Sequence, residues 1–136
     1  MGAINSIKVM INIKAIPRGN PQDVNAPAKF YAHAIATGEV SLERLAYLVS
    51  NQCTVRESDC YAVLLAMIHN VADELSQGRI VDMGVLGRFQ VGVRSEGLDA
   101  AADVSTAAVR SAHLNFRPGK RLRKTLATLE YKLIDG

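Results

Sequence analysis

The hydrophobic positions of this chain repeat with two different periods. In residues 7–15, Ile7, Val9, Ile11 and Ile13 fall on one face, and lysines and an asparagine lie on the other. This alternation predicts a half-buried β-strand. Residues 29–38 alternate less sharply and predict a second strand. Residues 17–27 hold three of the chain's four prolines, so a loop is expected between the two strands.

From Ser41 onward the hydrophobic period becomes helical. Ser41 is a good N-cap for a helix over residues 42–51, whose leucines cluster on one side. Thr54 and Glu57 then have the spacing of a capping box, which predicts the start of a second helix. That helix is expected to stop at Gly78, in the left-handed backbone conformation.

The second predicted helix has an unusually wide apolar face. At 100° per residue, its apolar side chains cover roughly 200° of the circumference. They are Cys60, Tyr61, Val63, Leu64, Leu65, Met67, Ile68, Val71 and Leu75. One short partner helix and a small sheet could scarcely cover this arc, whereas a second subunit could. The face therefore predicts a dimer.

Residues 78–94 predict a β-hairpin that bends at Gly84 and Gly87. Its long second strand and a further strand over residues 109–116 are each expected to turn one face inward. The inward side chains are Phe89, Val91, Val93, Ala112, Leu114 and Phe116, and the outward ones on the first of these strands are Arg88, Gln90, Gly92 and Arg94. Between the strands, the small and alanine-rich residues 95–108 are compatible with a loop, a reduced arm or a helical turn.

The last part of the chain predicts a short basic helix. Pro118 suits its first turn, and four leucines fall within about 60° on a helical wheel. They are Leu122, Leu126, Leu129 and Leu133. For residues 130–134, we favour an edge strand beside residues 7–15 over a continuation of the helix.

Charge is distributed unevenly along the chain. The net charge is only +3, but residues 39–103 hold ten acids and five arginines, a net −5, whereas residues 110–132 carry a net +6. A polyanion could therefore bind one face of the protein while the other stays neutral or acidic.

Several stretches together resemble a known family. Residues 41–93 look like the first half of the bacterial histone-like DNA-binding proteins of the HU and integration-host-factor family. The stretch "GVLGRF" (84–89) stands where that family has a glycine–aromatic turn, and "FRPGKRLRKTL" (116–126) matches its phenylalanine–basic–proline–glycine–lysine signature and last helix. The resemblance covers about residues 37–130 and is closest to a divergent HU-like branch with an N-terminal extension.

The resemblance implies an α+β, HU-like fold in which two chains form an intertwined homodimer. A helical hairpin would form the base, and the β-sheets would form a saddle over double-stranded DNA. Residues 1–36 would be an N-terminal extension of two strands and a proline-rich loop, and residues 37–136 the DNA-binding domain. Contacts to the phosphate backbone would come from Arg88, Arg94, Arg110, Arg117, Lys120, Arg121 and Lys124.

Residues 95–109 depart from the family pattern. Family arms are long basic ribbons whose tip proline wedges between base pairs and kinks the duplex. Here this segment has no proline, lysine or arginine, and Glu96, Asp99 and Asp103 make it acidic. We therefore expect sequence-independent binding with little bending driven by a wedge. An alternative is an HU scaffold that binds another protein, through the acidic segment or by strand addition at the N-terminal extension.

Other chemistries find little support in the sequence. His33, His69 and His113 show no ligand spacing, so neither a metal nor a cofactor is expected. No nucleophile–base or paired-carboxylate arrangement indicates an enzyme. Cys53 and Cys60 fit small hydrophobic residues in a reducing compartment, and no apolar run approaches a membrane span. The expected location is the cytoplasm, on the nucleoid.

Overall fold

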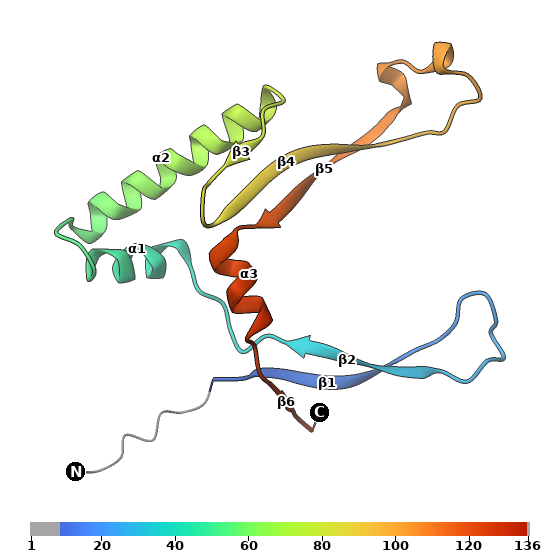
Figure 1. The fold of residues 1–136 in the computed structure, drawn as a ribbon, viewed down its shortest axis with the longest axis horizontal. Helices are drawn as coiled ribbons and strands as arrows, with labels where there is room; N and C mark the ends of the chain where they lie inside the picture. The colour runs from blue at the N-terminus through green and yellow to red at the C-terminus, as the bar shows by residue number, and fades with distance from the viewer. Residues whose placement is uncertain (1–8, 136) are drawn as a thin grey trace. The chain divides into compact units, whose positions relative to one another are not determined.

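The computed structural model describes residues 9–135 and divides the chain into two compact units (Figure 1). One unit comprises residues 9–40 together with 127–135, and the other comprises residues 41–126. The C-terminal segment thus belongs with the N-terminal strands. The division after residue 36, expected from the sequence, stays a prediction.

The first unit is a three-stranded sheet with the order β2-β1-β6. Strand β1 (Ile11–Arg18) pairs antiparallel with β2 (Lys29–Ile35), and β6 (Tyr131–Leu133) pairs parallel with the start of β1. Both N-terminal strands and the C-terminal edge strand expected from the pattern are present, but residues 9 and 10 of the first predicted strand and 36–38 of the second lie outside β1 and β2. Residues 7 and 8 of the first predicted strand lie outside the described residues.

Strand β1 extends further than the sequence suggested, through Pro17 into the expected loop. Proline removes a ladder donor and is tolerated only where no neighbouring strand needs that donor. Strand β6 pairs with residues 11–13 alone, so Pro17 has a single neighbouring strand, β2, where it lies opposite Phe30. The proline therefore fits this part of β1.

The second unit begins with two helices, α1 (Leu42–Ser50) and α2 (Glu57–Ser76). Ser41 is the N-cap of α1, as predicted, because its hydroxyl accepts a hydrogen bond of 3.1 Å from the Arg44 N–H. The predicted capping box before α2 is wrong. The N-cap there is Arg56, which makes no side-chain capping bond, and Glu57 is the first helical residue instead of the third.

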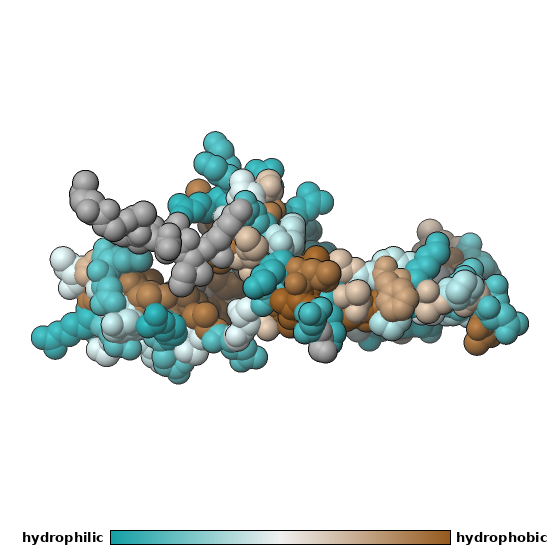
Figure 2. All heavy atoms as spheres, turned by 90° about the horizontal axis from the view of Figure 1, so that it is seen from below, coloured by the Kyte–Doolittle hydropathy of each residue, from teal (hydrophilic) through white to brown (hydrophobic). Residues whose placement is uncertain are grey.

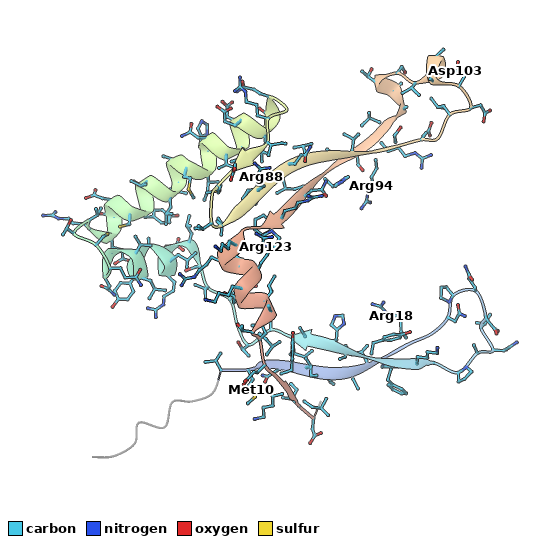
Figure 3. The ribbon with its side chains drawn as sticks, in the orientation of Figure 1. Met10, Arg18, Arg88, Arg94, Asp103 and Arg123 are labelled. Carbon is cyan, nitrogen blue, oxygen red and sulfur yellow. The ribbon has the colours of Figure 1, made fainter. Side chains whose placement is uncertain are left out.

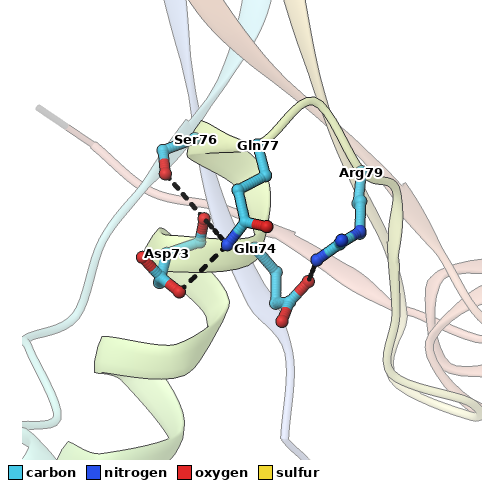
Figure 4. Close-up of polar contacts among 5 residues, drawn as sticks. All are labelled: Asp73, Glu74, Ser76, Gln77 and Arg79. Atoms are coloured by element: carbon cyan, nitrogen blue, oxygen red, sulfur yellow. Dashed lines mark hydrogen bonds and ion pairs between the residues drawn. The ribbon is translucent and has the colours of Figure 1, made fainter.

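The end of α2 is a glycine-terminated cap, as the sequence predicts, and Figure 4 shows the side-chain contacts around it. Gly78 has a φ of 82°, in the left-handed region that glycine adopts readily. The Gly78 N–H donates to the Leu75 carbonyl and the Arg79 N–H to the Glu74 carbonyl, which is the Schellman pattern. The Arg79 guanidinium also pairs with the Glu74 carboxylate at 2.5 Å.

The remainder of the second unit is an antiparallel sheet of order β3-β4-β5, followed by helix α3. Its strands are β3 (Val81–Asp82), β4 (Gly87–Ser95) and β5 (Val109–Pro118), and α3 covers Lys120–Ala127. Pro118 ends β5 and does not enter the helix, which corrects its expected position. Two short 3₁₀ turns, Ala101–Asp103 and Thr106–Ala108, occupy the arm between β4 and β5.

The chain buries very few hydrophobic side chains by itself. Among residues 9–135, only Ala46, Cys60 and Ala108 are buried hydrophobics. Figure 2 shows patches of brown, hydrophobic residues at the surface among teal, hydrophilic ones. The wide apolar face of α2 is part of this exposed surface, since Val63 is 64% and Ile68 47% accessible.

Candidate functional site

The register of β4 and β5 gives this hairpin two chemically different faces. Residues directly opposite each other in an antiparallel pair project to the same side, and successive residues alternate. The pairs Phe89–Phe116, Val91–Leu114 and Val93–Ala112 form an apolar face. The pairs Arg88–Arg117, Gln90–Asn115, Gly92–His113 and Arg94–Ser111 form the other face, called here the saddle face. The division of side chains between the two faces is as predicted, but the expected burial of the apolar one is not met within this chain, where Val93 is 56% and Phe116 42% accessible.

The apolar face of this hairpin is left largely uncovered by its own chain. The rings of Phe89 and Phe116 pack with centroids 4.8 Å apart, but Leu114 stays 55% accessible. An apolar hollow of about 300 Å³ continues this face toward α2. Its walls are Met67, Ile68, Val71, Ala72, Leu75, Met83, Leu86 and Phe89.

Two arginines lie directly opposite each other at one end of the saddle face. Arg88 and Arg117 are cross-strand partners, an arrangement that like charges make unfavourable. Asp82 on β3 offsets part of this repulsion, because its carboxylate accepts from the Arg88 guanidinium at 3.2 Å. A hydrogen bond from the Gly84 N–H, together with Arg88, lowers the pKa of Asp82 from its ordinary value of 3.8.

The middle of the saddle face is shaped by a glycine. A Cβ on Gly92 would meet the His113 imidazole at 2.5 Å and the Asn115 amide at 3.0 Å. The missing side chain lets both polar groups lie across the strand. Arg94 follows further along the face, opposite Ser111 (Figure 3), and forms no ion pair within the described part of the chain.

The two glycine-containing turns recognised in the sequence, residues 84–89 and 116–119, contact each other at the base of the sheet. The Gly119 N–H donates to the Leu86 carbonyl at 2.9 Å. A Cβ on Gly119 would overlap the carbonyl oxygen of Val85, and one on Gly87, whose φ is 146°, would meet the Phe116 ring at 2.5 Å. These close backbone approaches require glycine, and they fix the point at which α3 begins.

Helix α3 extends the basic surface beyond the sheet. Leu122 and Leu126 lie on one side of it, and Lys120 and Lys124 lie opposite them at a spacing of 3.6 residues per turn. Arg121 and Arg123 flank these lysines. Arg123, labelled in Figure 3, was absent from the predicted contact residues although its position on the helix is comparable to that of Arg121.

Arg110 lies in an irregular part of the sheet. The register shifts between Arg94 and Ser95, which pair with Ser111 and Val109, so Arg110 is the residue left over as a bulge. Its guanidinium pairs with the Glu96 carboxylate at 2.9 Å. Of the seven predicted contact residues, Arg88, Arg94 and Arg117 thus share the saddle face, Lys120, Arg121 and Lys124 lie on α3, and Arg110 is engaged at the base of the arm.

The arm between β4 and β5 is short of positive charge. Asp103, in the first 3₁₀ turn, lies at the end of the arm far from Arg88 (Figure 3). Ser105 caps the second turn by accepting from the Ala107 N–H. Within residues 9–135, no cluster of three histidine, cysteine or acidic side chains could hold a metal ion, and no helix could cross a membrane.

Comparisons with known proteins agree on the type of fold. Over 93% of its length, the chain superimposes on 49% of a crystal structure from Bacteroides vulgatus ATCC 8482 with a TM-score of 0.60 and 20% identity. That protein is described as a "putative bacterial DNA binding protein", and the present chain spans about half of its length. No curated protein matches the sequence.

A family match also covers most of the chain. Residues 10–132 match the family described as "HU domain fused to wHTH, Ig, or Glycine-rich motif", abbreviated HU-HIG. The match spans both units, including the N-terminal hairpin that the resemblance to HU itself left out. The conclusion from fold, turns and sequence is that this chain belongs to the HU-HIG family of HU-like proteins.

Proposed function

We propose that this protein is a homodimer that binds double-stranded DNA through its phosphate backbone, independently of base sequence. The observation that carries the proposal is the saddle face. It places Arg88, Arg94 and Arg117 on one side of a two-stranded ribbon and leads directly into the cations of α3. Phosphate contacts from such residues position a protein on DNA without reading its bases.

The dimer is supported by the hydrophobic surface that one chain leaves exposed. The apolar face of β4–β5 and the hollow beside α2 are continuous through Phe89. Burial of apolar surface contributes about 25 cal/mol per Å², and contiguous exposed apolar patches of this kind mark sites of association. A second copy of the chain would cover the face and would place two saddle faces in one molecule.

The arm supports binding with little bending. Glu96, Asp99 and Asp103 would repel phosphates, and no proline is available between β4 and β5 to wedge between base pairs. Arg110, already paired with Glu96, would contribute less than the arginines of the saddle face. The proposed DNA partner places the protein on the nucleoid, in the cytoplasm.

The experiment that tests the proposal is a duplex-binding titration as a function of salt. Each phosphate neutralised adds about −0.9 to the slope of log K against log salt. The variant Arg117→Ala/Lys120→Ala/Arg121→Ala is expected to keep its fold and to lose about 2.7 of that slope per protomer if all three residues contact phosphates.

A matched control removes the same charge elsewhere. Arg44, Arg56 and Arg79 belong to the helical part of the second unit. Their triple alanine variant is expected to keep the wild-type slope. A flat salt dependence of the wild-type protein, or equal losses in the two variants, would contradict DNA binding by the saddle face and α3.

A second candidate function is binding of another protein through the first unit. In the sheet order β2-β1-β6, strand β2 lies at the edge, and an open edge can accept an additional strand. Size-exclusion chromatography with and without duplex DNA separates the two functions. A dimer whose elution does not change with DNA at low salt would favour the protein partner.

A further inference from the structure

The first unit carries a second basic surface. By the alternation of the strands, Asn12, Lys14, Ile16 and Arg18 of β1 share one face with Lys29, Tyr31, His33 and Ile35 of β2, and with Lys132 of β6. We call this the basic hairpin face. No acidic side chain lies on it at any paired position of the sheet. The nearby turn contains Asp23, whose carboxylate accepts from the Asn25 N–H at 3.0 Å.

The opposite face of the same sheet is apolar. Ile13 lies opposite Ala34 and Leu133, and Pro17 lies opposite Phe30. In a two-faced sheet, the apolar side packs against other groups and the polar side meets solvent. Phe30 (70%) and Leu133 (67%) of the apolar face are exposed in this chain, but only the basic hairpin face has the charge to attract an anionic partner.

Two cations on this face oppose each other without compensation. Arg18 and Lys29 are direct cross-strand partners, an unfavourable arrangement for like charges. Neither forms an ion pair within the described residues, in contrast to Arg88, which has Asp82. An anionic group bound between them would relieve this repulsion.

The structure also orients one of these cations. The Arg18 guanidinium lies over the Tyr31 ring, 5.8 Å from its centroid, which is within cation–π range. Arg18, Lys29 and Tyr31 line a hollow of about 320 Å³ together with residues of the turn. Figure 3 shows Arg18 projecting from the β1–β2 hairpin.

We propose that the basic hairpin face is a second binding surface for the phosphate backbone of duplex DNA. Lys14 and Arg18 are four residues apart on a strand, a distance of about 13 Å, and this length of the duplex axis carries about four phosphates on each DNA strand. The choice of duplex DNA as the occupant rests on the proposed function, because a surface linked to a bound saddle face meets the same duplex at a high effective concentration.

The test uses the full-length protein and two variants that lose equal charge. Lys14→Gln/Arg18→Gln/Lys29→Gln removes three cations of the basic hairpin face, and Arg44→Gln/Arg56→Gln/Arg79→Gln removes three from the helical region. The first variant is expected to lose at least tenfold in duplex affinity at 50 mM salt and part of the salt slope. The second is expected to match the wild type in both. Equal affinities and slopes for all three proteins would overturn the inference.

A second measurement needs no variant and separates the two surfaces. Lysine acetylation of the wild-type protein, followed by peptide mass spectrometry, reports the accessibility of each lysine with and without a saturating duplex. Protection of Lys14, Lys29 and Lys120 is the expected result. Protection of Lys120 alone would overturn this inference and leave the saddle proposal intact, whereas protection of none would overturn both.

Discussion

Each of the two long hairpins of this chain places two cations opposite each other, and the hairpins differ in how that repulsion is compensated. In the β4–β5 hairpin, Arg88 and Arg117 are direct neighbours, and Asp82 on an adjacent strand neutralises one of them. In the β1–β2 hairpin, Arg18 and Lys29 are direct neighbours with no acidic partner among residues 9–135. An acidic partner within the protein stabilises the unbound state. Without such a partner, more positive potential remains to attract an anionic ligand.

The hairpins also differ in how tightly their ends are held. The base of β4–β5 is fixed by contacts between two glycine turns, in which Gly119 and Val85 approach closely. The turn of β1–β2 contains Gly19, where a Cβ would meet nothing within 4 Å. The β4–β5 hairpin is thus anchored to its unit at the start of α3, and the β1–β2 hairpin has an open turn. Four predictions test this comparison, beginning with the largest effect.

An aspartate on the apolar face of β4–β5 is expected to have the largest effect. Leu114→Asp would place an unpaired charge where the proposed dimer buries apolar surface, at a cost of about 3 kcal/mol or more. Ala32→Asp, on the apolar face of β2, is the matched change in the other hairpin. Size-exclusion chromatography and urea denaturation are expected to show a monomer of low stability for Leu114→Asp. A stable Leu114→Asp dimer would exclude this face from the interface.

A methyl group at Gly119 is expected to be the next most damaging change. Gly119→Ala would overlap the Val85 carbonyl oxygen, and forced overpacking costs about 1–3 kcal/mol. Gly19→Ala is the control, because its Cβ meets open space, and its free energy of unfolding is expected to change by less than about 1 kcal/mol. Equal denaturation midpoints for the two variants would show that the turn at 116–119 is not rigidly fixed.

Removal of the Asp82 charge that compensates Arg88 is expected to strengthen DNA binding. Asp82→Asn abolishes the ion pair with Arg88, while the asparagine oxygen still accepts from the Gly84 N–H. An exposed ion pair of this kind contributes about 1 kcal/mol or less to stability. Arg88, no longer paired with Asp82, is expected to make the slope of log K against log salt more negative by about 0.9 per protomer. It is also expected to raise duplex affinity several-fold at low salt. Unchanged affinity in the titration would mean that Arg88 does not reach phosphate.

The smallest expected effect is a gain in stability in the uncompensated hairpin. Lys29→Gln removes the like-charge repulsion with Arg18, which is worth about 0.2–1 kcal/mol. Arg117→Gln, its counterpart in β4–β5, is expected to gain less because Asp82 already offsets the repulsion there. Thermal denaturation in low salt measures both variants. A larger gain for Arg117→Gln would reverse the comparison between the hairpins.

Much of the local structure was readable from the sequence because it depends on near neighbours. Alternation predicted β1, β2, β4 and β5 and the face to which each side chain turns, since the side-chain period of a strand is two. Ser41 and Gly78 predicted the ends of α1 and α2 correctly because a cap is a local hydrogen-bond pattern. The capping box at Thr54 failed, since the same residue types also fit an irregular loop before a helix.

What the tertiary structure decided was which of these residues meet across long separations. The pairing of Arg18 with Lys29 depends on the register of β1–β2, and a shift of one residue would separate the two charges. The ion pairs of Arg88 with Asp82 and of Arg110 with Glu96, and the contact of Gly119 with Val85, likewise follow from strand register and turn geometry. Composition and periodicity determined which faces are apolar or basic, because those depend on residue type and spacing. Only the folded sheets placed the charges opposite one another, because cross-strand contacts are set by register and not by order along the chain.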